Sequence, residues 1–303
     1  MRTPHNDAPA KLPGRLLGSW RIPTARKPCS GYLNGRIQVN MARKDCPKCD
    51  GTGWKPVELD GVRRVTRCDC AEEQQSGQLL SQSRIPRRYE HCAFENFDAI
   101  KDSSTGQPNN YLIAAKLNAQ KFVEEYPLEI GLLFSGSTGV GKTHLAAAVI
   151  RELILSKNIP CLFYDFRDLL KAIQDSWNPV SQNSELRVLQ PVLDAEVLLL
   201  DDVAALNPSD WVKDTLGHIV NSRYNQKKVT LITTTLPFGD LASGSEARNR
   251  ASEFVPHLEK SLAQYGVTFQ SRLYEMCKVV EIKSEDYRKR IAKYRGTGAR
   301  DNP

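Results

Sequence analysis

The chain has 303 residues, of which 40% are hydrophobic and 25% are charged, and its formal net charge is +7 at pH 7. This composition indicates a globular protein with one main core and room for a small additional module. No apolar run approaches the length of a membrane-spanning helix, and the basic N-terminal region lacks the apolar segment of a signal peptide. We therefore expect neither a membrane protein nor a secreted one.

The first 40 residues concentrate the positive charge. Seven Lys or Arg residues oppose one acid, Asp7, so this segment contributes +6 and the rest of the chain only +1. Its frequent Pro and Gly residues predict a disordered extension over residues 1–40, which is either a solvated tail or an arm that contacts nucleic acid. Met41 is an alternative start of the chain, and mass spectrometry of the native N-terminus distinguishes the two starts.

Four of the eight cysteines cluster within residues 41–80, with the spacing C-x₂-C-x₁₈-C-x-C. Four thiolates form a tetrahedral site that suits Zn²⁺, so we predict a small zinc-binding module held by Cys46, Cys49, Cys68 and Cys70. A segment this short buries little core, so the metal would be the source of its fold. An iron–sulfur cluster and unrelated reduced thiols are the alternatives. The remaining cysteines are scattered, which favours a reducing, cytoplasmic setting over a disulfide framework.

The rest of the chain divides into a connector with a helix, 81–128, and a domain, 129–303, in which apolar strands alternate with helices. This alternation predicts an α/β fold with a five-stranded parallel sheet that is covered by helices on both faces. The expected strands are 131–136, 161–166, 197–202, 229–235 and 278–282.

The sequence GSTGVGKT fits the phosphate-binding pattern G-x-x-x-x-G-K-[ST], with an expected strand before it and an expected helix after it. The backbone N–H groups of such a loop surround phosphates, and the following helix adds the positive end of its dipole. We predict that Lys142 contacts the β- and γ-phosphates of ATP and that the Thr143 hydroxyl binds Mg²⁺. The expected nucleotide-binding residues here are Gly136, Ser137, Thr138, Gly139, Val140, Gly141, Lys142 and Thr143.

Two adjacent acids end another apolar strand in the sequence VLLLDDVAA. Asp201 is placed to hold Mg²⁺ through water, and Asp202 is placed to orient the attacking water as a general base. The next strand ends in Thr233, Thr234 and Thr235. Alone, three threonines on a strand indicate only β-propensity. A role for one of them between the phosphate-binding loop and the acids, in contact with the γ-phosphate or the water, depends on the family resemblance described below.

Further stretches of sequence extend this pattern. They are RIPRRYEHCAFENFD before the expected domain, LLLDDVAA and VNSRYNQKKVTLITTTLP within it, and FQSRLYEMCKVVEIKSEDYRKR near its end. Together with GSTGVGKTHLAAAV, they resemble AAA+ P-loop ATPases of the bacterial replicative helicase loader family, the DnaC/DnaI type, and their IstB-like relatives. The resemblance covers roughly residues 81–290. It implies that the strand ending in threonines lies between the P-loop strand and the acidic strand.

The resemblance also implies roles for particular residues. An SR dipeptide opens a helix that carries an arginine finger, here Arg272, and the sequence DYR supplies a sensor-2 arginine, here Arg288. The sensor-1 position falls on Thr235, where Asn is usual, and Asp202 stands where Glu is usual. An arginine finger acts on the nucleotide of a neighbouring subunit, so the resemblance implies a homo-oligomer with ATP at its subunit interfaces.

The implied function is an Mg²⁺-dependent ATPase that delivers a replicative DNA helicase onto single-stranded DNA. The alternative is an IstB-like transposition helper ATPase that acts on duplex DNA with a transposase. In some loaders a small zinc-bearing domain docks on the helicase, which would make the cysteine module the handle for that partner. The competing interpretation is that the module binds nucleic acid directly. Its surrounding cations are Lys48, Lys55, Arg63, Arg64 and Arg67.

Overall fold

Most of the chain after residue 41 is described in the computed structural model. The described residues are 42–59, 61–97, 107–178, 184–203, 208–236, 265 and 267–297. The chain divides into two units, Met1–Asn40 and Met41–Pro303, and every described residue belongs to the second. The expected N-terminal extension therefore lies outside the described residues. Among those that are described, no helix has both the length and the apolarity needed to cross a membrane.

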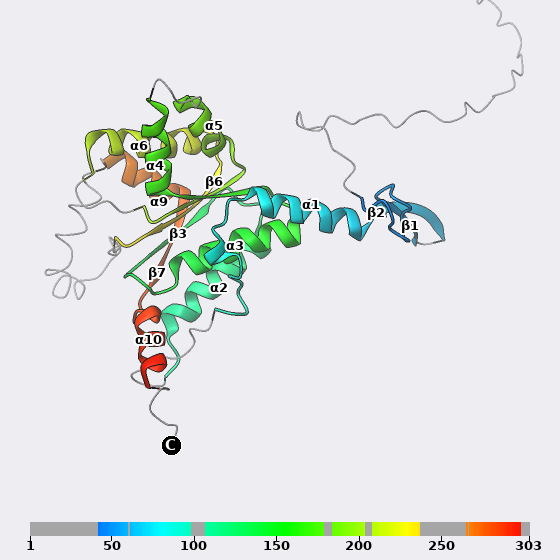
Figure 1. The fold of residues 1–303 in the computed structure, drawn as a ribbon, viewed down its shortest axis with the longest axis horizontal. Helices are drawn as coiled ribbons and strands as arrows, with labels where there is room; N and C mark the ends of the chain where they lie inside the picture. Colours follow the sequence, from blue (N-terminus) through cyan, green and yellow to red (C-terminus); the bar gives the residue numbers. More distant parts are fainter. Residues whose placement is uncertain are drawn as a thin grey trace, which may run out of the picture. The chain divides into compact units, whose positions relative to one another are not determined.

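A five-stranded parallel sheet with the strand order β4-β5-β6-β3-β7 is the centre of the second unit (Figure 1). Its strands are β3 (Gly131–Gly136), β4 (Cys161–Asp165), β5 (Val197–Asp201), β6 (Val229–Thr234) and β7 (Cys277–Ile282). The five expected strands are confirmed, each end within one residue of its expected position. β6 lies between β3 and β5, as the family resemblance implied, so the carboxyl ends of these three strands meet at one edge.

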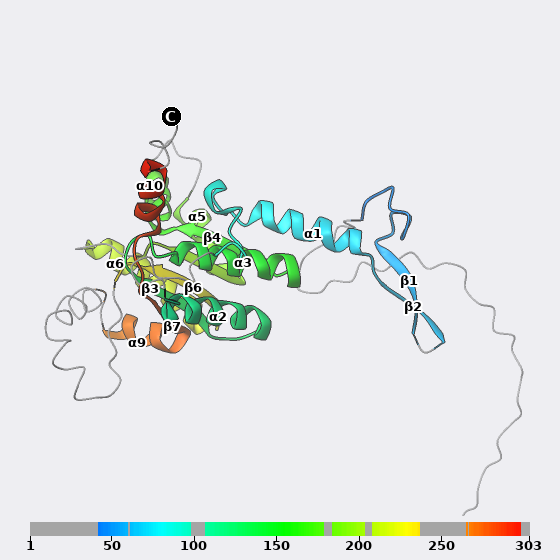
Figure 2. The ribbon, with the colours of Figure 1, turned by 90° about the horizontal axis from the view of Figure 1, so that it is seen from below.

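Helices cover both faces of the sheet (Figures 1 and 2). They are α2 (Asn110–Glu125), α3 (Lys142–Lys157), α4 (Phe166–Ser176), α5 (Glu185–Asp194), α6 (Asp210–Asn225) and α9 (Val267–Met276). Helix α10 (Tyr287–Thr297) follows β7. Alternate strand residues point to opposite faces, so Phe134 and Leu199 pack with α2 and α3. Leu133 and Leu198 pack with α4, α5, α6 and α9 on the other face. Burial of both faces explains why the strands are continuously apolar.

A hairpin and a helix precede this domain. The hairpin consists of β1 (Trp54–Leu59) and β2 (Val62–Arg67), and it is followed by α1 (Asp69–Gln82) and the short 3₁₀-helix η1 (Arg87–Tyr89). Leu59 pairs with Val62, and the Asp-Gly sequence between them is typical of two-residue turns. The last turns of α1 reach the core of the sheet domain, because α1 contacts α3 and Leu79 and Leu80 pack against the same core cluster. One continuous helix therefore joins the cysteine cluster to the sheet domain.

Helix α9 begins earlier than the family resemblance implied. Ser271 and Arg272 were expected to open a helix, but α9 starts at Val267 and Arg272 lies inside it. Phe269 and Leu273 are spaced by four residues, and both are buried in the core on that face of the sheet. Because this apolar periodicity starts before Ser271, the helix extends toward its N-terminus and the expectation was wrong.

Arg223 on α6 is a fully buried cation. Its guanidinium donates to the main-chain oxygens of Val192 and Ala195, both at 2.9 Å, and of Val229 at 2.6 Å, and its Nε donates to Thr230 Oγ1 at 2.9 Å. Burial lowers the pKa of Arg223 to about 10, so the side chain stays charged at neutral pH. These bonds tie the end of α5 to the start of β6.

Replacement of Arg223 by leucine is expected to lower the free energy of unfolding by about 3 kcal/mol or more, because several buried acceptors lose a charged donor. Urea denaturation of the two proteins measures the difference. Arg187→Leu is the matched control, since Arg187 is exposed on α5 and the same change there should stay within about 0.5 kcal/mol. Equal denaturation midpoints for the two variants would contradict this assignment.

Candidate functional site

The phosphate-binding loop joins the end of β3 to the start of α3. Gly139 and Gly141 have φ angles of +81° and +99°, a backbone region in which other residues are strained. A Cβ atom on Gly139 would collide with the Asp286 carboxylate, and one on Gly141 would lie 2.7 Å from Phe97 Cε2. Backbone conformation and close neighbours therefore both require glycine at these two positions.

Lys142 is the first residue of α3, and its side chain is buried. The ammonium donates to the main-chain oxygens of Gly136 at 2.9 Å and Ser137 at 2.8 Å. Burial lowers the pKa of Lys142, whereas the nearby Asp202 and Asp201 carboxylates oppose that shift. Charged phosphate oxygens are stronger acceptors than these carbonyls, so the cation lies where a nucleotide would engage it.

Asp201, Thr143 and Thr233 form a hydrogen-bonded cluster where the strands end. Thr233 Oγ1 donates to Asp201 Oδ1 at 2.6 Å and accepts the backbone N–H of Asp202 at 2.9 Å. Burial raises the pKa of Asp201, and hydrogen bonds from Thr233 and Thr143 oppose that shift. Thr143 and Asp201 offer a hydroxyl and a carboxylate oxygen, the donor types that Mg²⁺ prefers, so the expected ion fits this pair.

Asp202 follows in an unusual backbone conformation, with a φ angle of +55°. Aspartate adopts this left-handed region more readily than most residues, and the hydrogen bond from the Asp202 backbone N–H to Thr233 holds it here. Its carboxylate lies 3.5 Å from the guanidinium of Arg167 on α4. Arg167 is largely exposed, so solvent screens this ion pair, and the interaction is readily exchanged for another.

These groups line one cleft of ≈ 980 Å³, a volume that suits a nucleotide. Thr235 and Arg288, the expected sensor residues, line the same cleft. Helix α10 is held against the phosphate-binding loop, because the backbone N–H of Tyr287 donates to the Gly139 oxygen at 3.1 Å. Thus the expected P-loop, acidic and sensor residues come together from β3, α3, β5, β6 and α10.

Arg272 occupies a different place. It lies on α9, with its guanidinium 5.4 Å from the centre of the Tyr224 ring, and it is not among the described residues that line the cleft of its own chain. This separation is compatible with the expected action on a neighbouring subunit.

The connector contributes cleft residues to which the sequence alone assigned no role. One contact holds the connector beside α3: Nε2 of His144 on α3 lies 3.1 Å from the main-chain oxygen of Ala93 in the connector. Burial lowers the pKa of His144. The signal in the sequence was the density of aromatic, histidine and arginine side chains in RIPRRYEHCAFENFD. The connector and α2 residues that line the cleft are Arg88, Tyr89, His91, Cys92, Asn96, Phe97 and Leu112.

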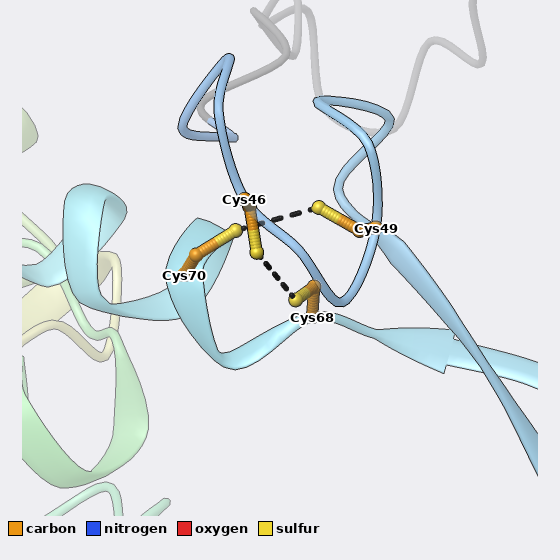
Figure 3. Close-up of side chains that lie close together, drawn as sticks. All are labelled: Cys46, Cys49, Cys68 and Cys70. Atoms are coloured by element: carbon orange, nitrogen blue, oxygen red, sulfur yellow. Dashed lines mark hydrogen bonds between the residues drawn. The ribbon is translucent and has the colours of Figure 1, made fainter.

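The four clustered cysteines form a compact group of sulfur atoms (Figure 3). All four Sγ atoms lie within 4.8 Å of one another, with Cys46 and Cys68 at 3.7 Å and Cys49 and Cys70 at 3.6 Å. A tetrahedral zinc site with Zn–S distances of about 2.3 Å places its sulfurs about 3.8 Å apart. The geometry and the donor set therefore fit zinc.

Local contacts prepare this cluster for a cation. A hydrogen bond from the Lys48 backbone amide lowers the pKa of Cys46 to about 7, which favours the thiolate form that binds metal. Burial raises the pKa of Cys70 to about 12, so a bound cation would be needed to keep that thiol ionised. Asp69, at the start of α1, pairs with Lys48 at 2.9 Å and with Lys55. Lys48 lies in the turn between Cys46 and Cys49, which we call the knuckle, and Lys55 lies on β1, so the two ion pairs join the knuckle to the hairpin.

The parallel sheet, the glycine-rich loop and the acid-tipped β5 define an AAA+ P-loop ATPase fold. Comparison with known proteins places the chain within this class: residues 72–252 match the family described as IstB-like ATP binding protein. The chain belongs to that family.

Individual relatives agree with this placement. The replicative helicase loader DnaC of Escherichia coli (strain K12) is 30% identical over 156 residues, which are 51% of this chain and 60% of that protein. The phage-like element PBSX protein XkdC of Bacillus subtilis (strain 168) is 24% identical over 264 residues, 82% of this chain and 86% of that one. A solved structure of the DnaC helicase loader matches with 29% identity and a TM-score of 0.50, over 65% of this chain and all of that chain. The chain thus spans less than two thirds of the curated DnaC length.

Proposed function

We propose that this protein is an ATP-dependent loader that delivers a replicative DNA helicase onto single-stranded DNA. The observation that carries the proposal is the similarity to the helicase loader DnaC in both sequence and fold, and the P-loop, acidic and sensor residues of this chain line one cleft. A nucleic-acid remodelling role needs a conformational cycle, and binding and hydrolysis of ATP at a P-loop supply one.

We infer that ATP binds with its phosphates in the Gly136–Thr143 loop, where Lys142 supplies a buried cation. Bound Mg²⁺, held by Thr143 and Asp201, would neutralise phosphate charge. Asp202 would orient the attacking water, and Thr233 positions both acids through its single hydroxyl. Thr235 and Arg288, which line the same cleft, would contact the γ-phosphate.

Subunit contacts are part of the proposal. Arg272 lies outside the cleft of its own chain, so we infer that it reaches the nucleotide of a neighbour in a homo-oligomer. Its stacking on Tyr224 would fix the guanidinium direction, because a cation over an aromatic face is held by the ring quadrupole.

Arg272→Ala is expected to retain ATP affinity and to lose turnover by about a thousandfold, since an arginine finger acts mainly on transition-state charge. Steady-state ATPase rates and nucleotide titration measure the two effects. A mixture of Arg272→Ala and Lys142→Ala subunits should regain activity, because one interface type combines an intact Lys142 with an intact Arg272. Normal assembly without any regained activity would show that Arg272 acts in its own chain or only supports α9.

The family description IstB-like ATP binding protein favours one second candidate, a transposition helper that acts on duplex DNA with a transposase. Affinity purification of the tagged protein from its source cell separates the two candidates. Mass spectrometry should identify a replicative helicase that is retained by wild-type protein with ATP and reduced with Lys142→Ala. A transposase in its place would reverse the assignment.

A further inference from the structure

The β1–β2 hairpin projects exposed apolar side chains that the ATPase cycle does not use. Trp54 is 52% exposed, Val65 is 69% exposed and Pro56 is also exposed. The hairpin is anchored at its base, where the Cys68 backbone N–H donates to the Gly53 oxygen at 2.8 Å. An exposed tryptophan on a hairpin that is anchored beside the cysteine cluster is a preformed contact surface.

Strand pairing sorts the hairpin side chains between two faces. Cross-strand partners in an antiparallel pair share a face, so Trp54 shares one with Arg67, and Pro56 shares it with Val65. The guanidinium of Arg67 lies 5.9 Å from the centre of the Trp54 ring. We call this surface the tryptophan face. Its members are Trp54, Pro56, Glu58, Arg63, Val65 and Arg67.

The hairpin also carries available positive charge. Arg63 and Arg64 are exposed, and neither forms an ion pair with any residue in the described part of the chain. They are consecutive strand residues and therefore lie on opposite faces, so a chain passing along either side of the ribbon meets a guanidinium. By contrast, Lys48 and Lys55 are engaged by Asp69.

We propose that the tryptophan face binds single-stranded nucleic acid. Bases would stack on the Trp54 ring and on the adjoining Pro56–Val65 pair, while Arg63, on the same face, contacts a phosphate. Aromatic platforms beside cations are the recurring design of sequence-tolerant single-strand binding. The charge of the hairpin favours this polyanionic partner over an apolar protein segment. The inference rests on the hairpin alone, so it goes beyond the loader function and stands or falls separately from it.

A direct test uses the fluorescence of Trp54 in the full-length, zinc-loaded protein. The chain has four tryptophans, and Trp20, Trp177 and Trp211 are replaced by phenylalanine so that Trp54 reports alone. Oligothymidine of about 20 nucleotides is the probe, because it has no secondary structure and every base has a stacking face. Stacking should quench the emission saturably, and added salt should reverse the quench. Absence of any quench at saturating probe would overturn the proposal.

Binding of labelled oligothymidine, followed by fluorescence anisotropy in the otherwise native chain, provides the second arm. Trp54→Ala should weaken binding at least about fivefold, the lower end for loss of one stacked base, and Trp54→Phe should restore most of it. Arg63→Ala should reduce the slope of log affinity against log salt by about 0.7, the value for one phosphate that the protein no longer neutralises. Arg64→Ala removes the same charge from the opposite face and should change the slope less.

Two valines on the same strand give a matched control. Val65 lies on the tryptophan face and Val62 on the opposite one, and both are exposed. Val65→Glu should weaken oligothymidine binding more than Val62→Glu, although both add the same charge. Equal effects, or unchanged DNA binding together with a failure to capture purified helicase, would overturn the proposal and make the hairpin a protein-docking surface. ATPase rates, measured in parallel, report separately on the loader assignment.

Discussion

Lys142→Ala should lower ATP turnover at least about a hundredfold, because it removes the buried cation that faces the phosphates. In the structure this ammonium donates to two P-loop carbonyls and lies close to Asp201 and Asp202. Among the described residues that line the cleft there is no other lysine, so none can replace it. Binding of a fluorescent ATP analogue should be lost together with turnover. Asp201→Asn should instead retain much of the binding and lose Mg²⁺-dependent turnover, because it keeps the shape of the side chain and removes its charge.

Lys121→Ala is the control for this experiment. Lys121 is exposed on α2 and pairs with Glu125, one helical turn away on the same helix. Its replacement should leave both ATP binding and turnover unchanged. Wild-type ATPase rates in Lys142→Ala and Asp201→Asn, after removal of contaminating ATPases, would rule out the assigned cleft.

Cys46→Ser combined with Cys49→Ser should abolish binding of one Zn²⁺ per chain and unfold the hairpin with the knuckle. Structural zinc supplies folding free energy outright, and the four thiols are the source of the module's core. The ATPase domain should survive, since its sheet and helices form their own cores and the end of α1 packs on α3. Elemental analysis, near-ultraviolet circular dichroism and nucleotide titration measure these three outcomes.

Cys29→Ser is the matched control, because Cys29 belongs to no cluster in the sequence spacing and lies outside the described residues. It should retain zinc. Iron or no metal in the wild-type protein would contradict the zinc assignment. The double variant also separates two uses of the module. If the hairpin binds single-stranded nucleic acid, the variant should lose oligothymidine binding and retain helicase capture. If the module binds the helicase instead, the variant should lose helicase capture and retain oligothymidine binding.

Much of the sheet domain was predictable because its signals are local and agree with one another. Runs such as VLLLD are buried on both faces and end at functional residues, so the strand, its end and Asp201 follow from one pattern. The same holds for the P-loop, where strand, glycines and helix are consecutive. The order of β6 between β3 and β5 came from the family resemblance, since the pattern of strands alone does not fix their lateral order.

Other features depend on contacts between distant residues and left weaker signals. Thr233, rather than Thr235, hydrogen-bonds to Asp201, because the register that pairs Leu200 with Ile232 brings Thr233 beside Asp201. The connector lines the cleft through contacts with residues far away in the sequence, such as that between Ala93 and His144. The periodicity of apolar residues within a segment does not predict such contacts. The β1–β2 hairpin has short, exposed strands, and the Asp-Gly sequence between Leu59 and Val62 was the local sign of it.

Helicase transfer with purified components tests the central claim most directly. Replicative helicase from the source organism is mixed with closed circular single-stranded DNA, with or without this protein and ATP, and DNA-bound helicase is isolated by gel filtration. The loader assignment predicts that wild-type protein with ATP increases DNA-bound helicase well above the level seen with Lys142→Ala or Arg272→Ala. Equal helicase on the DNA in all of these reactions, with ATP-dependent assembly of this protein on duplex DNA instead, would contradict it.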